Sequence, residues 1–348
     1  MDKKTRFDSL VGRAQKIIIT VHRGVDDDAV CSILAVYDYL TSNLPDKLVK
    51  MVITGFKDYR WDDLENFEKI EWVPDLVDCI AKTDLLIFLD GNRNDRFTNR
   101  PKDLDLNSFQ SICIDHHVDE PEKYTEYLGD KTAMATCQII ADLLYPDNLG
   151  LSKETGKALL IGILGDSGCF KCVNQKNSSV FLVAKRLSDL TRLSILSLAR
   201  RFDSLSFEQL EVIKVLLENT TRVDLDGFPG FSYSWLPQQI LEKFDEVTVD
   251  DAYHRYLGWF VRHIVGYPWG FVVTPRKSAD HFKISFRSLP GSVNVRLIGN
   301  LFGGGGHDLA GGGRYFLKEG EKIDAKAVAK KVVRIIKGAK LELTPKTD

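Results

Sequence analysis

Hydrophobic residues in the first half of the chain alternate between short apolar runs and longer stretches with helical spacing. The apolar runs predict buried strands at Ile17–Val21, Leu48–Thr54, Leu85–Leu89 and Ser111–Ile114. The intervening and following stretches repeat their apolar residues as helices do, at Ala29–Leu40, Ala133–Tyr145 and Glu154–Leu164. Strands rich in isoleucine, valine and leucine that alternate with helices predict an α/β domain with a mainly parallel sheet flanked by helices.

The second half of the chain changes pattern twice. From Val180 to Thr220 the spacing is almost wholly helical. Strand-like alternation then returns at Phe231–Leu236, Gly270–Thr274 and Phe282–Ser288, with helical segments near Asp251–Val261, Val293–Leu301 and Ile323–Ile336. We therefore expect an N-terminal α/β domain at residues 1–190, a helical connector at residues 191–224, and a smaller C-terminal α/β domain at residues 225–348.

Charge and hydropathy exclude several classes of protein. The 348 residues include 47 Lys and Arg against 49 Asp and Glu, a net charge of −2, which argues against a protein that binds long duplex nucleic acid. A near-neutral chain can still bind a short anionic ligand in a local positive pocket. Nothing approaches 18 consecutive apolar residues, so we expect no membrane span. The first residues lead into no apolar signal core, which predicts a cytoplasmic protein.

All six cysteines fall in the first half of the chain. Most are embedded in apolar runs, where cysteine acts as a small hydrophobic residue. Cys169 and Cys172 form a single C-x-x-C pair, and a structural zinc site needs a second pair of ligands that the sequence does not offer at a suitable spacing. The cysteines therefore predict a reduced protein without a zinc site.

Acidic residues and histidines gather where the predicted strands end. His22, Asp26 and Asp28 follow the first strand, Asp90 ends the third, and Asp166 follows an apolar helix. The fourth strand is followed directly by the triplet Asp115, His116 and His117. Because the carboxyl ends of parallel strands meet at one edge of a sheet, these groups are expected to converge there.

Four carboxylates that converge in a buried pocket repel one another unless cations neutralise them. Two divalent ions would balance four aspartates, and carboxylate oxygen mixed with imidazole nitrogen favours Mn²⁺ over zinc. The alternative is that each aspartate is a helix N-cap and each histidine a surface residue. That alternative requires a separate coincidence at each of four strand or helix ends.

These clusters also form a recognisable set of motifs. In the first half they are His22-x-x-x-Asp26-x-Asp28, Asp90, Asp115-His116-His117 and Gly165-Asp166-Ser167-Gly168. In the second half they are Phe286-Arg287-Ser288 and the glycine run Gly303 to Gly306 followed by His307. In this order the motifs resemble the DHH phosphoesterase family, and within it the DHH–DHHA1 branch of RecJ-type exonucleases and NrnA-type oligoribonuclease/pAp phosphatases. The resemblance spans nearly the whole chain.

The resemblance implies a pair of divalent cations, Mn²⁺ first, with Mg²⁺ or Co²⁺ as alternatives. It assigns one ion to His22, Asp26 and Asp90, and the other to Asp28, Asp90, His116 and Asp166, so that Asp90 bridges both. It also implies that His117 points at the substrate phosphate and that Asp115 orients the adjacent imidazole. A water activated by the ions would then attack phosphorus in line.

In the second domain the resemblance implies a substrate-binding role for Arg287, Gly304, Gly305, Gly306 and His307. Consecutive glycines let a backbone approach an anion closely and offer successive N–H groups to it. Taken without the resemblance, the glycine run could equally be a flexible loop and Arg287 a solvated edge residue. Three aromatic residues near these motifs are expected in the core rather than stacked on bases: Phe286, Phe302 and Tyr315.

The sequence thus predicts a two-metal hydrolase of phosphoester bonds in short oligonucleotides or in 3′-phosphoadenosine 5′-phosphate (pAp). One alternative is a phosphodiesterase of cyclic or linear signalling dinucleotides, of the c-di-AMP/pApA type. A second alternative is a catalytically silent nucleotide-binding module. Expected partners are short RNA or DNA oligonucleotides or small nucleotides and no membrane, and the sequence leaves open whether the chain forms a homodimer.

Overall fold

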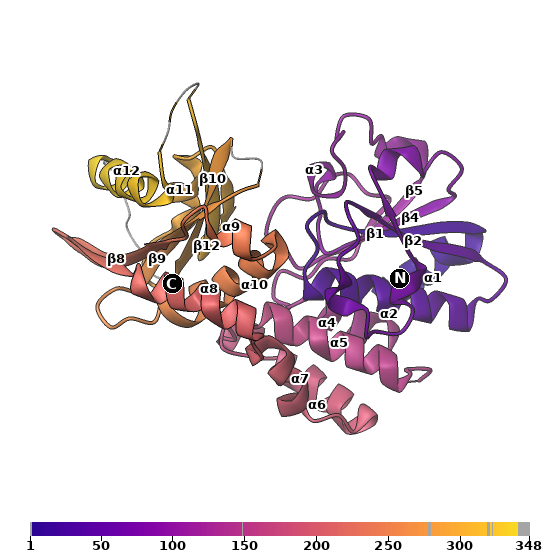
Figure 1. Cartoon of the computed structure of the whole chain (residues 1–348). Coiled ribbons are helices and arrows are strands. Elements are labelled where there is room, and N and C mark those ends of the chain that lie inside the picture. The colour runs from indigo at the N-terminus through magenta and orange to yellow at the C-terminus, as the bar shows by residue number, and fades with distance from the viewer. Residues whose placement is uncertain (1, 148, 278–279, 319–320, 322, 340–348) are drawn as a thin grey trace. The chain divides into compact units, whose positions relative to one another are not determined.

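The computed structural model describes residues 2–147, 149–277, 280–318, 321 and 323–339, apart from the side chain of His307. The chain divides into two compact units, Met1–Ser204 and Leu205–Asp348 (Figure 1). The division falls between α7 (Ile195–Asp203) and α8 (Phe207–Glu218), within the stretch that the sequence predicts as a helical connector. The domain bounds drawn from the sequence stay a prediction.

The first unit contains a six-stranded sheet in the order β3-β2-β1-β4-β5-β6, with every neighbouring pair parallel. Its strands are β1 (Lys16–Val21), β2 (Leu48–Thr54), β3 (Ile70–Val73), β4 (Leu85–Leu89), β5 (Gln110–Ile114) and β6 (Glu126–Tyr127). The chain runs outward from β1 to β3 and returns to pair β4 with the other side of β1. Ligands of open parallel sheets bind beyond the carboxyl ends of the strands at such a reversal of strand order. The sheet therefore places a candidate site at the ends of β1 and β4.

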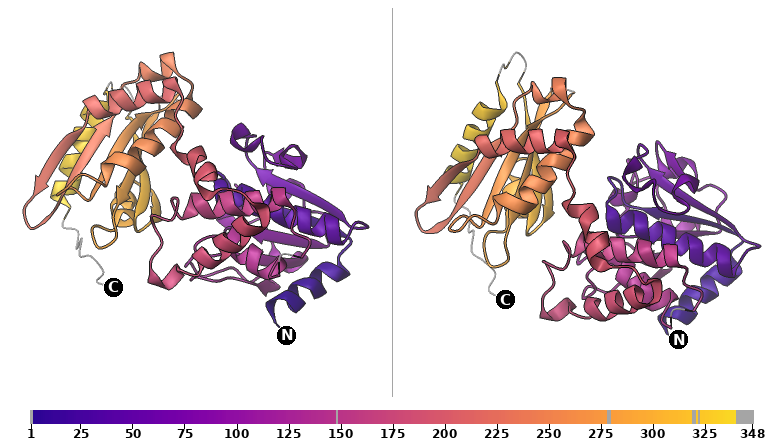
Figure 2. Two further views of the ribbon diagram at one scale, coloured as in Figure 1. Left: turned by 90° about the horizontal axis from the view of Figure 1, so that it is seen from below. Right: turned by 60° about the horizontal axis from the view of Figure 1, so that its bottom comes forward.

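Helices cover one face of this sheet, as the views of Figure 2 also show. They are α1 (Lys3–Arg13), α2 (Asp27–Asn43), α4 (Thr136–Leu144), α5 (Lys153–Asp166) and α6 (Val180–Thr191). Helices α2 and α4 lie against the strands, and α5 packs against both of them. The opposite face is covered by α3 (Asn94–Phe97), by short 3₁₀ turns and by loops, whose side chains pack on Ile18, Leu86 and Phe88.

Burial on both faces explains why the strands of the first unit are apolar without alternation. All five residues of β4 are buried, as are the last five of β1. Burying a leucine, isoleucine or phenylalanine side chain stabilises the fold by about 1.5–3 kcal/mol, so the centre of this sheet supplies a rigid frame for the loops at its edge. The predicted α/β class and its parallel sheet are confirmed.

The second unit contains a mixed six-stranded sheet in the order β11-β12-β10-β9-β8-β7. Its strands are β7 (Thr221–Leu225), β8 (Phe228–Trp235), β9 (Trp269–Pro275), β10 (His281–Ser288), β11 (Gly305–His307) and β12 (Ala310–Phe316). Only the pair β8–β9 is parallel. The helices are α9 (Ile240–Lys243), α10 (Glu246–Tyr256), a π-helical turn (Leu257–Val261), α11 (Val295–Asn300) and α12 (Ala325–Gly338).

Helices lie on both faces of the second sheet. The apolar side of α12 packs on β8 and β9 together with α11, while α8 and α10 pack together on the other face around Val272. Phe286 and Phe302 are buried in the core beside α12, and Tyr315 packs against it, as the sequence predicts.

The glycine run does not form the flexible loop that the sequence offered as one interpretation. Gly305–His307 forms β11 and pairs antiparallel with β12, while binding of an anion by this backbone stays a prediction. The N–H groups of Gly303 and Gly304 donate to the carbonyl oxygens of Asn300 and Gly299. Glycine is unfavourable in strands, so this hairpin could not be predicted from residue preferences.

Candidate metal centre

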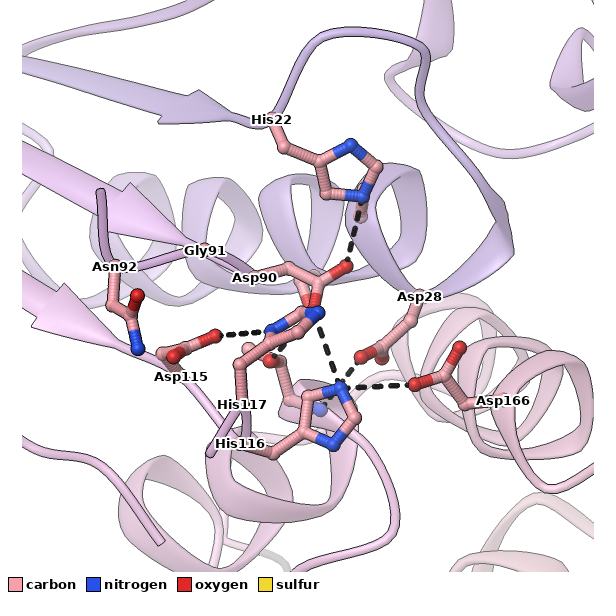
Figure 3. A network of polar contacts seen from close by, with 12 residues as sticks. His22, Asp28, Asp90, Gly91, Asn92, Asp115, His116, His117 and Asp166 are labelled. Atoms are coloured by element: carbon pink, nitrogen blue, oxygen red, sulfur yellow. Dashed lines mark hydrogen bonds and ion pairs between the residues drawn. The ribbon is translucent and has the colours of Figure 1, made fainter. Parts of the chain in front are cut away.

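Three strand ends and the starts and ends of three helices supply the residues of the candidate site (Figure 3). His22 directly follows β1, Asp90 directly follows β4, and Asp115 directly follows β5. Their elements are adjacent in the sheet, with β1 paired to β4 and β4 paired to β5. The topology of the parallel sheet thus brings together side chains that lie far apart in the sequence.

Asp26 and Asp28 lie at the start of α2. Asp26 is the N-cap of this helix, where its Oδ1 accepts a hydrogen bond from the N–H of Ala29 at 3.0 Å. The capping role that the sequence offered as an alternative is therefore real, but the second oxygen of Asp26 lies 3.6 Å from Nε2 of His22. The same carboxylate caps a helix and faces the cluster.

Asp90 occupies the centre of the cluster. Its side chain is almost fully buried, at 2% exposure, with Oδ2 lying 3.3 Å from Nε2 of His22 and Oδ1 lying 3.5 Å from Nε2 of His116. Its backbone has a φ of 55°, in the left-handed region that few residues other than glycine adopt. Such a conformation costs about 1–3 kcal/mol and is found mainly at functional sites. It turns the chain sharply at the end of β4 and directs the carboxylate between the two imidazoles.

His116 and Asp166 complete the side of the cluster nearest α5. Nε2 of His116 lies 3.0 Å from Oδ2 of Asp166, which is the last residue of that helix. Asp28 faces the same imidazole from the first turn of α2 (Figure 3). His116 follows β5, Asp166 ends α5 and Asp28 lies in the first turn of α2, so residues from three separate parts of the chain meet on this side of the cluster.

Asp115 contacts the second histidine of its triplet. Oδ1 of Asp115 lies 2.7 Å from Nδ1 of His117, whereas no contact joins it to the ring of His116 in the part of the chain that the structure describes. The imidazole that Asp115 orients is thus that of His117. Because Asp115 is fully buried and acceptor-only when ionised, this hydrogen bond favours the tautomer of His117 with its proton on Nδ1.

The start of α4 supplies contacts that the sequence reasoning missed. The N–H groups of Thr136 and Cys137 donate to the two oxygens of Asp28 at 2.6 and 2.9 Å. The hydroxyl of Thr136 donates to Oδ1 of Asp90 at 3.1 Å. The unpaired N–H groups at a helix N-terminus favour a negative charge, so α4 holds the buried Asp28 carboxylate in place. A hydroxyl residue at the start of a predicted helix was the only signal available.

The pKa values of the buried carboxyl groups are shifted in two directions. Burial raises the pKa of Asp28 well above its usual value, and the charges of Asp90 and Asp166 raise it further. Burial also raises the pKa of Asp166, to about 6. For Asp90 burial acts in the same direction, but hydrogen bonds with His116 and His22 outweigh it and hold the pKa well below its usual range.

Burial shifts the pKa values of the two histidines in the opposite direction from those of the carboxyl groups. Burial lowers the pKa of His22 and of His116, but their contacts with the surrounding carboxylates outweigh it and leave both pKa values well above the usual one. Positive charge is thus favoured at the centre of the cluster. A bound cation would supply the same charge.

The donor atoms fall into three overlapping groups whose members lie within 4.8 Å of one another, namely His22, Asp26 and Asp90; Asp28, His116 and Asp166; and Asp90, His116 and His117. The first group equals one ligand set predicted from the sequence. The second group contains three of the four residues predicted for the other ion. The fourth, Asp90, lies 3.5 Å from His116 of this group. Oxygen and imidazole donors in this mixture fit a hard or borderline divalent cation. The residues present therefore fit the expected pair of ions, while the role of each ligand stays a prediction.

The predicted substrate residues lie in the second unit. The Arg287 guanidinium donates to the carbonyl oxygen of Phe286 at 2.8 Å, and burial lowers its pKa. Among the described residues no carboxylate forms an ion pair with it. Gly304 precedes β11, and Gly305 and Gly306 lie in it. The side chain of His307 lies outside what the structure describes.

All six cysteines are free, and none contributes to the metal-ligand groups found in the described residues. Cys172 is exposed and Cys169 is half-buried, in a turn that follows α5. In the same described part of the chain, no helix combines the length and the apolar composition that crossing a membrane requires.

Comparisons with known proteins agree with this geometry. Residues 16–163 match the DHH family, N-terminal domain. The Streptococcus mutans protein named "Probable bifunctional oligoribonuclease and PAP phosphatase NrnA" is 29% identical over 322 residues, which cover 88% of this chain and 92% of that protein. The Mycoplasma pneumoniae protein named "Bifunctional oligoribonuclease and PAP phosphatase NrnA" is 24% identical over 306 residues, which cover 87% of this chain and 89% of that protein.

A solved structure extends the similarity to the whole fold. The exopolyphosphatase-related protein of Bacteroides fragilis superposes with a TM-score of 0.78 at 21% identity, covering 95% of this chain and 94% of that chain. At this level of identity the similarity shows a shared fold. The match of residues 16–163 to the DHH family, N-terminal domain, and the named relatives that align over most of the chain confirm the resemblance drawn from the motifs.

Proposed function

We propose that this chain is a metal-dependent hydrolase of phosphoester bonds, and that its substrates are short oligonucleotides and pAp. The hydrolase class follows from the DHH domain and from relatives, named as oligoribonucleases and PAP phosphatases, that align over most of the chain. The substrates are inferred from the names of those relatives. The free cysteines accord with a reducing compartment, and we place the activity in the cytoplasm.

The observation that carries the proposal is the position of Asp90 between two imidazoles and within two ligand groups. We assign one divalent cation to His22, Asp26 and Asp90, and a second to Asp28, Asp90, His116 and Asp166, with Mn²⁺ as the first choice. Such ions lower the pKa of a bound water and neutralise phosphate charge. The four aspartates supply the negative charge that balances a pair of divalent ions, and α4 keeps the Asp28 carboxylate oriented toward them.

His117 is the residue of the chain that we assign to the substrate phosphate. Oδ1 of Asp115 accepts a hydrogen bond from the Nδ1–H group of this imidazole and thereby fixes the plane of the ring. With Nδ1 held, Nε2 is the atom that would face a phosphate oxygen, and a protonated ring would stabilise the negative charge that develops there. Asp115 is a positioning residue in this scheme because it acts through His117.

Arg287 is the residue of the second unit that we assign to substrate anchoring. A guanidinium that is removed from water and has no carboxylate partner among the described residues is stabilised by a bound anion. A phosphate group of the substrate is such an anion. Gly304, Gly305, Gly306 and His307 remain proposed neighbours of this anchor on the strength of the family motif.

The test is hydrolysis of 5′-phosphorylated dinucleotides, longer oligonucleotides and pAp by the full-length chain with Mn²⁺, and again with a chelator. The proposal predicts turnover that requires the metal and that falls as oligonucleotides lengthen. Turnover confined to a cyclic or linear signalling dinucleotide would replace the proposed substrates. Nucleotide binding without turnover in any metal would show a silent binding module and refute the proposal.

A further inference from the structure

A pocket of about 450 Å³ lies in the second unit, at one end of β10 and β12. Four basic side chains line it, together with the glycine backbone at residues 303–304 and 312–313: Arg276, His281, Lys283 and Arg314. Lys283 and Arg314 face each other in the register of β10 and β12. The volume lies in the range of small-molecule sites, which span about 300–1,000 Å³. A cavity of this size with basic walls suits a small organic anion.

The basic side chains of the pocket outnumber the acidic groups that neutralise them. Arg276 pairs with Asp250 at 2.8 Å and lies 3.5 Å from Glu246, while Lys283 lies 3.8 Å from Asp250. Neither acidic residue lines the pocket. Among the described residues, the exposed guanidinium of Arg314 forms no ion pair. Arg276 and Lys283 thus share two carboxylates, and His281 lies 2.7 Å from Asp280, which leaves Arg314 without an acidic partner among the described residues.

The environment of Lys283 reports this excess of positive charge. Burial, together with the guanidinium groups of Arg276, Arg287 and Arg314, lowers the pKa of its ammonium group to about 8, while Asp250 acts in the opposite direction. A bound anion would offset the repulsion between the Lys283 ammonium group and the neighbouring guanidinium groups. The same anion would form an ion pair with the guanidinium of Arg314.

Glycines make the wall of the pocket from backbone. An added Cβ at Gly304 would lie 1.9 Å from the carbonyl oxygen of Gly312, and one at Gly313 would lie 2.6 Å from Cβ of Phe302. Only glycine permits the two backbone segments to approach this closely. Beside this wall, the centroid of the His281 ring lies 5.5 Å from the centroid of the Phe316 ring, and Phe316 is 59% exposed. A flat aromatic surface next to basic side chains is the usual setting for a nucleobase attached to a phosphate.

The pocket is separate from the anchor proposed at Arg287. Lys283 and Arg287 lie on the same face of β10, four residues apart, which in a strand is a distance of about 13–14 Å. Arg287 does not line the pocket. We propose that this pocket binds the phosphate group of a nucleotide, with Arg314 and Lys283 as its ligands, at a second site distinct from Arg287. A nucleoside monophosphate and the phosphorylated end of a short oligonucleotide share the chemistry that it recognises.

The experiment measures binding of adenosine 5′-monophosphate (AMP) to the full-length chain in chelator, by isothermal titration calorimetry, so that hydrolysis plays no part. In the Arg287→Ala background, Arg314→Glu should raise the Kd for AMP at least tenfold. Arg334→Glu is the matched control, because Arg334 is an exposed arginine of α12 that forms no ion pair among the described residues. This control should bind AMP as the background does. Inorganic phosphate should compete with AMP, and adenosine should bind at least tenfold more weakly than AMP.

Equal affinity of the Arg314→Glu and Arg334→Glu variants for AMP would overturn the proposal. So would loss of all AMP binding on Arg287→Ala alone. If Arg314→Glu fails to fold by circular dichroism, Lys283→Gln takes its place with the same expected result. A 5′-phosphorylated dinucleotide that binds tighter than AMP would identify an oligonucleotide end as the ligand, and equal affinities would identify a monophosphate; either supports the site. Because binding is read without turnover, the outcome is independent of the proposed hydrolase activity.

Discussion

Replacing Asp90 by asparagine removes one negative charge from the centre of the cluster and changes little else. Asparagine has nearly the same shape as aspartate and is one of the residues that most readily adopt a left-handed backbone, so the φ of 55° at this position is retained. The amide can still accept a hydrogen bond from Thr136. Any loss of activity therefore reports the charge and the metal-binding oxygen, and not a collapse of the turn after β4.

The size of the effect follows from the surroundings of this carboxylate. Two unit charges about 4 Å apart interact by about 4 kcal/mol at an effective dielectric constant of about 20. Since about 1.4 kcal/mol corresponds to a factor of ten, losing this interaction weakens the binding of an adjacent cation about a thousandfold. Asp90 belongs to two of the three ligand groups, so both ions lose it at once. We expect kcat/KM to fall at least a thousandfold at a fixed metal concentration.

The assay compares hydrolysis of a dinucleotide in Mn²⁺ by the wild type, Asp90→Asn and a control, with Mn²⁺ affinity measured by calorimetry. Asp103→Asn is the control, because Asp103 is an exposed aspartate of the same unit that lies outside the metal-ligand groups. It should behave as the wild type. Activity of Asp90→Asn within tenfold of the wild type, or unchanged Mn²⁺ affinity, would refute the assignment of Asp90 as the shared ligand.

Four further predictions follow from particular contacts. Thr136→Val removes the hydroxyl bond to Asp90 and should lower Mn²⁺ affinity or kcat by about 10–100-fold; an unchanged enzyme would remove Thr136 from the site. Arg287→Ala should raise KM and leave kcat nearly intact, and a collapsed kcat at unchanged KM would contradict the anchoring role. Because His22 and His116 have raised pKa values, the metal-free cluster is stabilised fully below about pH 6.5 and loses this contribution as pH rises through those values. Mn²⁺ should therefore raise the melting temperature more at pH 8 than at pH 6, and an equal or smaller shift at pH 8 would count against this linkage. Gly304→Ala places a Cβ against backbone and should reduce the free energy of unfolding by about 1–3 kcal/mol or more, which lowers the melting temperature. A melting curve like that of the wild type would show that the hairpin adjusts.

Much of the site could be predicted because parallel strands end at a common edge. That rule was enough to expect His22, Asp90 and Asp115 near one another, and the structure places them at the ends of β1, β4 and β5. The order of the strands in the sheet could not be predicted from the sequence. Only the pairing of β1 with β4 explains why Asp90 lies directly beside His22.

Contacts made by packing rather than by sequence pattern were not predictable. The N–H groups of Thr136 and Cys137 reach Asp28 across a separation of more than a hundred residues, and nothing in their local pattern signals an anion. The choice of His117 over His116 as the partner of Asp115 depends on the side-chain conformations at the end of β5.

The second unit was harder to predict for a related reason. Strand β12 contains three consecutive glycines, Gly311, Gly312 and Gly313, which carry no hydrophobic alternation. Their strand conformation comes from pairing with β10 on one side and, at the shared positions, with β11 on the other. Glycine disfavours strands, so tertiary hydrogen bonding outweighs the preference of these residues.

The most direct measurement is anomalous diffraction from a crystal of the full-length chain grown with Mn²⁺. We expect two manganese peaks about 3.5–4 Å apart, with the Asp90 carboxylate between them. One peak should be held by His22 and Asp26 and the other by Asp28, His116 and Asp166. A single peak away from Asp90, or no peak among these six side chains, would contradict the central claim.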